Sequence, residues 1–454
     1  MSVLRQRDTD MTSGSIVKHL LLFAVPLLIG NAFQQLYNTV DSVVVGNYVG
    51  KEALAAVGSV APIINMLIGF FNGLSAGAGV VISQRYGAHD GERVHRAVQT
   101  TVALTLALCV ALTAIGVLMV PAMLRMMRTP QDVEAQAAEY LRIYFGGLSG
   151  LLLYNAGAGI LRAVGDSRRP LYFLIFSALT NTALDILFVK FFRMGIAGAA
   201  IATVIAQSLS AILVLATLTR STADYRITWS RLRFHRDALK RICSIGLPSA
   251  LQMAVTSFSN VFVQSYVNRF GSSCMAGWTS YQKIDSFALL PMMSLAMAVT
   301  TFVGQNLGAG NRKRAHRGTY TGFGLALGIT AAILAPLMVF APQLISLFNR
   351  EEGVLRYGTL FIRVMSPFYL LCVVNQIFAG SLRGAGVTKV PVLIMLSSFV
   401  VFRQIYLYVT YRLIGTILPV TLGYPMGWVL CSVLIYLYYR FGNWSKQTTC
   451  KEGS

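Results

Sequence analysis

Two carboxylic acids lie inside long apolar stretches of this sequence, where an ionised side chain is costly. Asp41 belongs to the apolar run that starts near Ile16, and Asp185 belongs to the segment NTALDILFV, residues 181–189. Asn181 precedes Asp185 by four residues, so the two side chains share one face of a helix. An ionisable residue inside an apolar span points to a proton or ion site.

Asp41 is also part of a polar stripe. Side chains able to form hydrogen bonds recur every three to four residues, which places them on one helical face: Asn31, Gln34, Gln35, Asn38, Asp41 and Ser42. Hydrogen bonding between helices would explain the amides but not the carboxylate. The stripe is therefore expected to face a bundle interior or a water-filled cavity.

Thr203 adds a hydroxyl group from the small-residue run GIAGAAIATVIAQS, which suits close helix contact. Together Asp41, Asn181, Asp185 and Thr203 offer two carboxyl groups, an amide and a hydroxyl, a set suited to H⁺ or Na⁺. Burial and a neighbouring like charge raise the pKa of a carboxyl group by about 3–5 units, so such a pair could exchange a proton near neutral pH. No other metal site is expected, since the six cysteines and five histidines lack ligand spacing.

The elements that must position these residues are membrane-spanning helices. The chain is 55% hydrophobic and only 12% charged, whereas soluble proteins carry about 25% charged residues. Apolar runs long enough to cross a bilayer recur along the whole chain. They predict an all-α membrane protein with twelve spans, at about 16–45, 53–82, 95–121, 132–160, 170–191, 195–219, 240–267, 276–303, 317–341, 354–381, 390–412 and 416–440.

The net charge of +21 reflects orientation rather than nucleic-acid binding. The N-terminus, the even-numbered loops and the C-terminus hold 25 of the 38 Lys and Arg residues, the odd-numbered loops hold nine, and four lie within spans. By the positive-inside rule, both termini are cytoplasmic. We expect a multi-pass protein of the plasma membrane (the inner membrane of a bacterium), with the lipid bilayer as its surroundings.

The chain repeats itself at a nearly constant distance. ISQRYGAHDGERVHR (82–96) resembles VGQNLGAGNRKRAHR (303–317), and six residues recur at an offset of 221. With one extra residue, Pro26 and Asn38 correspond to Pro248 and Asn260. The repeat predicts a six-helix lobe at 1–219, a cytoplasmic linker at 220–239, and a second lobe with a short tail at 240–454. Because six crossings return the chain to its starting side, the lobes should be related by a pseudo-two-fold axis along the membrane normal.

The two halves differ in their acids. Phe262 or Val263, Tyr406 and Tyr424 stand at the positions that correspond to Asp41, Asp185 and Thr203. Ion chemistry is therefore expected in the first half. Arg403 is expected to snorkel or to pair with a neighbour. A cavity between the lobes is the architecture of an alternating-access transporter, and its candidate lining residues are Asn31, Gln34, Asn38, Gln252, Thr256, Asn260, Lys283 and Asp285.

Four motifs resemble those of the multidrug and toxic compound extrusion (MATE) family: residues 26–59, TPQDVEAQAAEYLRIY (129–144), LRAVGDSRRP (161–170) and TTFVGQNLGAG (300–310). The resemblance implies a twelve-helix, two-lobe fold that exports amphipathic, often cationic compounds in exchange for H⁺ or Na⁺. It also implies an amino-lobe cation site at Asp41, Asn181, Asp185 and Thr203. Spans seven and ten lack the acids of another branch of the family.

A secondary active antiporter for drugs or toxic metabolites is thus the leading hypothesis. The alternative is a lipid-linked oligosaccharide flippase of similar architecture, which uses a larger and more cationic cavity. An enzyme is not expected, because no nucleophile motif, metal cluster or GxxxxGK[ST] loop occurs. We expect a monomer without cofactors and without a nucleic-acid partner, with small amphipathic or cationic molecules as substrates.

Overall fold

A computed structural model describes residues 10–126, 131–442 and 444, and every regular element among them is helical. The first half contains α1 (Ile16–Tyr48), α2 (Lys51–Gly87), α3 (Gly91–Met126), α4 (Gln131–Gly146), α5 (Leu148–Ala163), α6 (Arg168–Asp185), the π-helical η1 (Ile186–Phe191) and α7 (Gly195–Arg220). A short 3₁₀ turn, η2 (Trp229–Arg231), precedes the second half.

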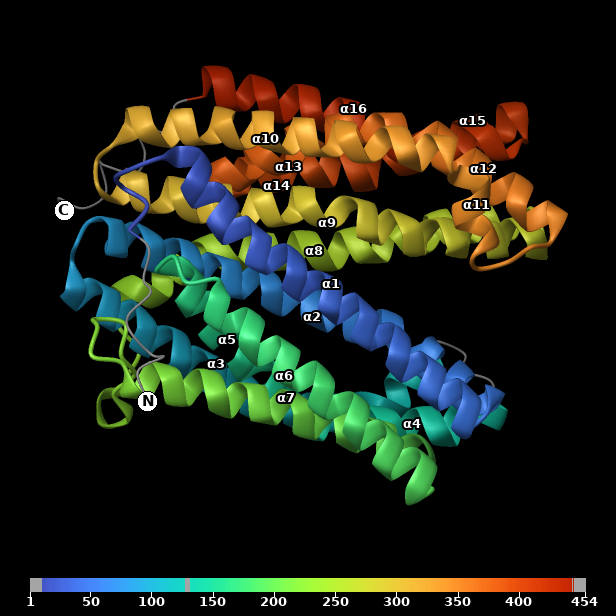
Figure 1. Ribbon diagram of the computed structural model, residues 1–454, viewed down its shortest axis with the longest axis horizontal. Coiled ribbons are helices and arrows are strands. Elements are labelled where there is room, and N and C mark those ends of the chain that lie inside the picture. Colours follow the sequence, from blue (N-terminus) through green and yellow to red (C-terminus); the bar gives the residue numbers. More distant parts are fainter. Residues whose placement is uncertain (1–9, 127–130, 443, 445–454) are drawn as a thin grey trace. The chain divides into compact units, whose positions relative to one another are not determined.

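The second half follows the same order, with three additional elements, α11, η3 and α15. It contains α8 (Arg236–Asn268), α9 (Ser272–Gly308), α10 (Arg312–Val339), α11 (Ala341–Ser346), α12 (Glu352–Met365), η3 (Ser366–Phe368), α13 (Tyr369–Gly384), α14 (Lys389–Leu396), the π-helical η4 (Ser397–Phe402), α15 (Arg403–Ile414) and α16 (Ile417–Phe441). Figure 1 shows these helices in chain order.

The number of membrane crossings agrees with the sequence. The described residues contain 11 helices long and apolar enough to span a membrane, and α4 with α5 forms a twelfth span bent by 46°. The bend lies at Gly147, between two helices of 16 residues that are each too short to cross alone. The prediction of an all-α membrane protein with twelve spans is confirmed.

The chain forms two compact units, and the boundaries between them fall inside α1 and α8, the first helix of each half. Unit 1 comprises residues 1–10 and 29–247, and unit 2 comprises 11–28 and 248–454. The first part of α1 therefore packs in unit 2, and the first part of α8 packs in unit 1. Pro26 and Pro248 lie inside these helices close to the points of division, and proline weakens a helix at such a point because it lacks a donor. The predicted linker at 220–239 falls entirely in unit 1.

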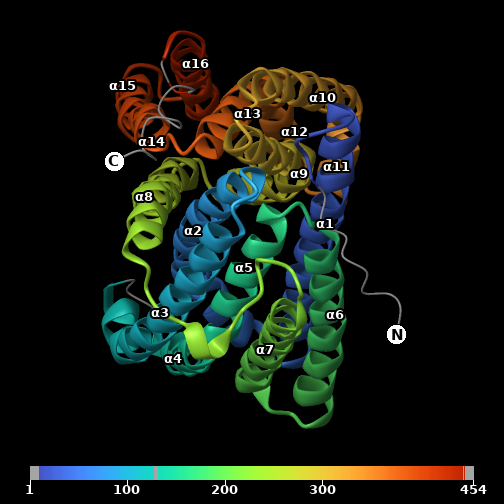
Figure 2. The same cartoon turned by 90° about the vertical axis from the view of Figure 1, so that its left-hand side faces the viewer.

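The internal repeat extends to the elements and their packing. The starts of α2, α4, α5 and α6 recur 221 residues later as the starts of α9, α12, α13 and α14. In unit 1, α5 packs against α2, α3 and α7, and in unit 2 its counterpart α13 packs against α9, α10 and α16 (Figure 2). The two halves are therefore structural copies as well as sequence repeats.

The repeated glutamine of the motif has the same task in both units. In unit 1, the Gln84 side chain accepts a hydrogen bond of 2.7 Å from Arg241 at the start of α8. In unit 2, the Gln305 side chain accepts one of 3.0 Å from the backbone of Met11, just before α1. Each glutamine thus contacts the beginning of a helix whose later part belongs to the other unit.

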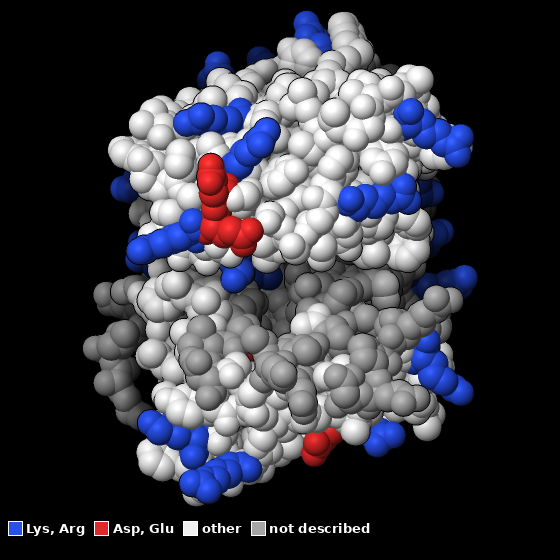
Figure 3. Space-filling view, turned by 90° about the vertical axis from the view of Figure 1, so that its right-hand side faces the viewer, with Lys and Arg blue, Asp and Glu red and all other residues white. Residues whose placement is uncertain are grey.

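Charged side chains gather at the ends of the helices rather than along them. Figure 3 faces the end of the molecule that carries α11, where basic side chains are scattered over a mainly uncharged surface. In unit 2, the loops at this end expose Arg269, Arg350 and Glu351, and the last turn of α15 exposes Arg412. Uncharged flanks between charged ends are what a bilayer requires.

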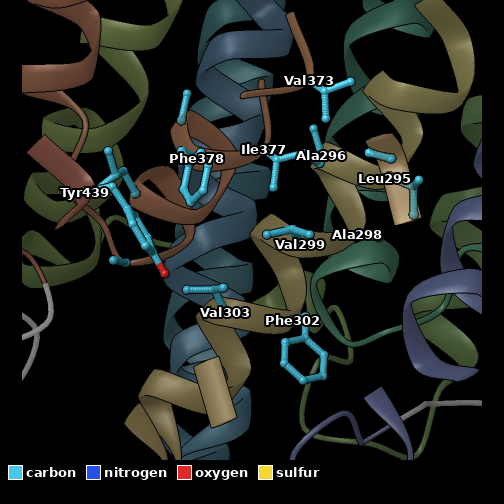
Figure 4. Close-up of a cluster of buried hydrophobic side chains, with 14 of the residues drawn as sticks. Leu295, Ala296, Ala298, Val299, Phe302, Val303, Val373, Ile377, Phe378 and Tyr439 are labelled. Carbon is cyan, nitrogen blue, oxygen red and sulfur yellow. The ribbon is translucent and has the colours of Figure 1, made fainter. Parts of the chain in front are cut away.

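Each unit has its own apolar core. In unit 2, one core cluster joins Val299, Phe302 and Val303 of α9 to Phe378 of α13 and Tyr439 of α16, as Figure 4 shows. The rings of Phe378 and Tyr439 lie 4.7 Å apart between centroids. Aromatic packing of this kind adds about 0.5–1.5 kcal/mol to the burial of the rings, and it gives the helices a rigid frame for the polar residues inside.

Candidate functional site

The two acids singled out by the sequence come together inside unit 1. Asp41 lies on α1 and Asp185 is the last residue of α6, and their carboxyl groups are within hydrogen-bonding reach of each other. Asp185 is fully buried and Asp41 is partly buried. Two carboxyl groups in such contact require a proton or a cation between them, since like charges at this distance repel strongly.

Asn181 and Thr203 complete the site. The Asn181 amide is oriented so that its nitrogen donates to Oδ2 of Asp185 at 2.8 Å and its oxygen accepts from the backbone N–H of Thr203 at 3.2 Å. Both side chains are at least 96% buried. The amide therefore connects α6 to α7 and orients the Asp185 carboxylate.

One oxygen of each acid has no protein partner. Oδ1 of Asp41 and Oδ1 of Asp185 are buried without a hydrogen bond, and neither acid takes part in the ion pairs formed among the described residues. Buried polar atoms in folded proteins are normally satisfied, so orphaned oxygens indicate a missing ligand or proton. The site can accept positive charge, and no protein cation supplies it.

The local fold of α6 and α7 places these groups. Directly after Asp185 the chain becomes π-helical over η1, a wider and rarer geometry that often occurs at functional sites. The facing part of α7 is built of small residues, and a Cβ at Gly198 would lie only 3.1 Å from the Cβ of Phe188. Small residues let the two helices approach closely, so Asn181 can reach the backbone of Thr203.

Sequence reasoning missed a shell of tyrosines around the acids. The hydroxyl of Tyr37 lies within hydrogen-bonding reach of Thr203, and the residue is close to Asp41 and Asp185. Tyr140 and Tyr144 of α4 stack with ring centroids 6.3 Å apart and lie close to Tyr37. A signal was present, because Tyr37 and Asp41 are four residues apart, as are Tyr140 and Tyr144, and each pair shares a helical face.

The candidate cavity residues are distributed over both units. Asn31 and Gln34 lie on α1 in unit 1, whereas Gln252, Thr256 and Asn260 lie on α8 in unit 2. The side chain of Asn38 lies outside the described part of the structure. A cavity between the lobes stays a prediction.

Lys283 and Asp285 of α9 have different surroundings. Lys283 is exposed, and its ammonium group lies 5.4 Å from the ring centroid of Phe348. The Asp285 carboxylate accepts a hydrogen bond from Tyr281 at 3.0 Å and another from Tyr369. The two residues are two positions apart and do not share a helical face. Within the described residues no cluster of three His, Cys, Asp or Glu side chains could hold a metal ion.

The whole chain is similar to known transporters. The MatE family model matches residues 26–187 and 248–409, one segment in each half. The probable multidrug resistance protein YpnP of Bacillus subtilis is 32% identical over 435 residues, which cover 96% of this chain and 97% of that protein. The probable multidrug resistance protein YoeA of the same species is 32% identical over 446 residues, which cover 96% of each chain.

Solved structures agree with this assignment. A MATE protein crystallised in a bent conformation superposes with a TM-score of 0.91 at 25% identity, covering 98% of this chain and 99% of the other. A transporter of the MOP superfamily from Pyrococcus furiosus gives a TM-score of 0.90 at 26% identity, covering 96% and 97%. With its duplicated six-helix fold and a family match in both halves, this chain belongs to the MatE family of multi-pass membrane transporters.

Proposed function

We propose that this protein is a secondary active antiporter that exports amphipathic, often cationic drugs or toxic metabolites in exchange for H⁺ or Na⁺. It would work by alternating access in the plasma membrane, with both termini in the cytoplasm. The coupling ion binds at Asp41 and Asp185, supported by Asn181 and Thr203. One observation carries the proposal: the carboxyl groups of Asp41 and Asp185 lie within hydrogen-bonding reach, each has a buried oxygen without a partner, and neither takes part in the ion pairs among the described residues.

The coupling follows from the charge of this pair. When the pair is ionised, repulsion between Asp41 and Asp185 favours a separation of α1 from α6. When a proton or Na⁺ enters, the carboxyl groups attract a common partner and the helices repack. An ion that binds one arrangement better than the other shifts the equilibrium between the two. The gradient of that ion then drives the change in unit 1 that alters the affinity for substrate.

The contact between the carboxyl groups favours H⁺ over Na⁺. A hydrogen bond between two carboxyl groups needs one proton and no further ligands. A Na⁺ ion would need several oxygen ligands around it, and the amide of Asn181 is already engaged with Asp185 and Thr203. We therefore expect the coupling ion to be H⁺.

The test is ethidium efflux from proteoliposomes under separately imposed pH and Na⁺ gradients. We expect the pH gradient to drive efflux in the wild type. Asp41→Asn mimics the neutral form of the acid, so it should insert and fold normally yet lose gradient-driven efflux. If purified Asp41→Asn protein transported at the wild-type rate with the same pH and Na⁺ dependence, Asp41 would have no coupling role. If neither gradient drove efflux of any dye, the assignment as an antiporter of drugs would fail.

A further inference from the structure

Unit 2 contains a cation buried in the middle of a span. Arg403 is 2% exposed, and it lies 14 residues from the start of the span Lys389–Ile414 and 11 from its end. At about 1.5 Å per residue, the guanidinium is attached roughly 15–20 Å from either end of the helix. Of the two alternatives expected for Arg403, pairing with a neighbour is the one that the structure shows, because its side chain turns inward instead of reaching the interface.

The contacts of this guanidinium are neutral. Its Nη2 donates to Oγ of Ser259 at 2.8 Å and to Oδ1 of Asn260 at 2.9 Å. Its carbon lies 4.6 Å from the ring centroid of Tyr424. Among the described residues no carboxylate forms an ion pair with Arg403. The nearby acid is Asp285, which interacts electrostatically with Tyr424, the same tyrosine that Arg403 contacts. An amide oxygen, a hydroxyl and an aromatic face are groups that bind a cation.

One of these three groups corresponds to a member of the ion site of unit 1, and the other two correspond to residues on the same helix as Asp41. With the offsets of the repeat, Tyr424 stands at the position of Thr203, while Asn260 and Ser259 stand at the positions of Asn38 and Tyr37. In unit 1 the hydroxyl of Tyr37 lies within reach of Thr203, and in unit 2 the guanidinium of Arg403 contacts both Ser259 and Tyr424. The same three helices of the repeat thus enclose a group in each unit.

The charges at the two positions are opposite. In unit 1 the enclosed groups are two carboxyl groups with orphaned oxygens, which accept a cation. In unit 2 the counterparts of Asp185 and Asp41 are Tyr406 and Val263, and the guanidinium of Arg403 is already present. Arg403 itself corresponds to Thr182, which is next to Asn181 in the sequence. The second half therefore lacks both acids and has gained a covalently attached cation close to their counterparts in the sequence.

We propose that the Arg403 guanidinium is a tethered cation that permanently fills, in unit 2, the counterpart of the cation site of unit 1. Unit 2 then needs no exchangeable ion at this position, and its helices α8, α15 and α16 stay in the arrangement that a bound cation stabilises. Coupling becomes the task of unit 1 alone. The comparison of the two positions rests on the proposed function of the unit 1 site, but the occupancy of the unit 2 site does not.

A truncated side chain tests the proposal directly. Arg403→Ala leaves a polar pocket shaped for a small planar organic cation, so free guanidinium should bind there. We expect Arg403→Ala to lower the melting temperature of the purified protein by roughly 5–10 °C. Guanidinium chloride at low millimolar concentration should restore at least half of this loss in a saturable manner. Urea has nearly the same shape without the charge, and it should restore nothing.

Arg412→Ala is the matched control. Arg412 lies on the same helix and its guanidinium carbon is 4.4 Å from the ring centroid of Tyr408, but its side chain is exposed. The melting temperature of Arg412→Ala should stay near that of the wild type. Guanidinium should raise the melting temperature of neither this variant nor the wild type. An absence of rescue in Arg403→Ala, or equal rescue by urea, would overturn the tethered cation.

A second pair of variants covers the case in which Arg403→Ala does not fold. Arg403→Lys keeps a charge on a shorter stem, whereas Arg403→Gln keeps hydrogen bonding and removes the charge. The proposal expects the Lys variant to melt higher than the Gln variant, and the reverse order would contradict it. Because melting is measured without transport, a failure here is distinct from a failure of the antiporter assignment, which the gradient experiments test.

Discussion

Asp185 holds the most constrained carboxylate of the ion site, because Asn181 fixes one of its oxygens and leaves the other without a partner. An asparagine at position 185 would keep the shape but could carry neither charge nor proton exchange. We expect Asp185→Asn to reduce gradient-driven ethidium efflux in proteoliposomes by at least tenfold, a loss of about 1.4 kcal/mol of coupling.

Asp285→Asn is the control for this experiment. Asp285 is also an acid inside a span, but it lies in unit 2 and accepts hydrogen bonds from Tyr281 and Tyr369. An asparagine oxygen can still accept from a phenol, so this variant should retain most of the wild-type efflux. Equal damage from both variants would mean that coupling is not confined to unit 1.

Tyr37 offers a finer test of the site. Its hydroxyl lies within hydrogen-bonding reach of Thr203, beside the acids, and Tyr37→Phe removes that hydroxyl without changing the packing of the ring. A hydrogen bond contributes about 0.5–1.5 kcal/mol, so the ion concentration for half-maximal efflux should shift by roughly 2- to 10-fold. The maximal rate at saturating gradient should change little, and an unchanged half-maximal concentration would place Tyr37 outside the site.

At the scale of elements, unit 1 depends on the close approach of two helices. A Cβ at Gly77 of α2 would lie 2.5 Å from Cα of Gly246 in α8. Backbone cannot retreat as a side chain can, so Gly77→Ala should push the start of α8 away from α2. Overpacking of this kind costs about 1–3 kcal/mol, and it should appear as a lower melting temperature of the purified protein.

Gly324→Ala serves as the reference for that measurement. Gly324 lies within α10, and nothing stands within 4 Å of a Cβ built there. Alanine has the higher helix propensity by about 1 kcal/mol, so this variant should melt at the wild-type temperature or slightly above it. A drop for Gly324→Ala as large as that for Gly77→Ala would show that the contact between α2 and α8 is not the cause.

At the scale of the whole molecule, entry of substrate between the lobes requires that water reach the polar stripe of α1. Gln34 on α1 is exposed and follows the polar face, whereas Leu179 on α6 is 65% exposed on an apolar face. In a variant without native cysteines, Gln34→Cys should react with a membrane-impermeant thiol reagent, and ethidium should protect it. Leu179→Cys should stay unreacted, because a thiolate does not form in lipid. An unreactive Gln34→Cys would contradict a water-filled cavity along α1.

Much of this protein was determined by its sequence alone. The length and spacing of apolar runs established twelve spans, because every backbone polar group in a bilayer must be satisfied within a helix. The offset of 221 residues revealed the duplication, and the contact between Asp41 and Asp185 was anticipated from acids on polar helix faces. These features depend on local pattern, which a single sequence displays directly.

Only the tertiary structure decided the rest. Three features depend on which helices pack together. They are the assignment of the first parts of α1 and α8 to the unit opposite the rest of each helix, the tyrosines around the acids, and the inward turn of Arg403. The sequence around Arg403 does not predict that its partners are Ser259, Asn260 and Tyr424. They lie more than 140 residues before it or one helix after it. Periodicity predicts which face of a helix is polar, whereas the partner of that face is set by packing between distant segments.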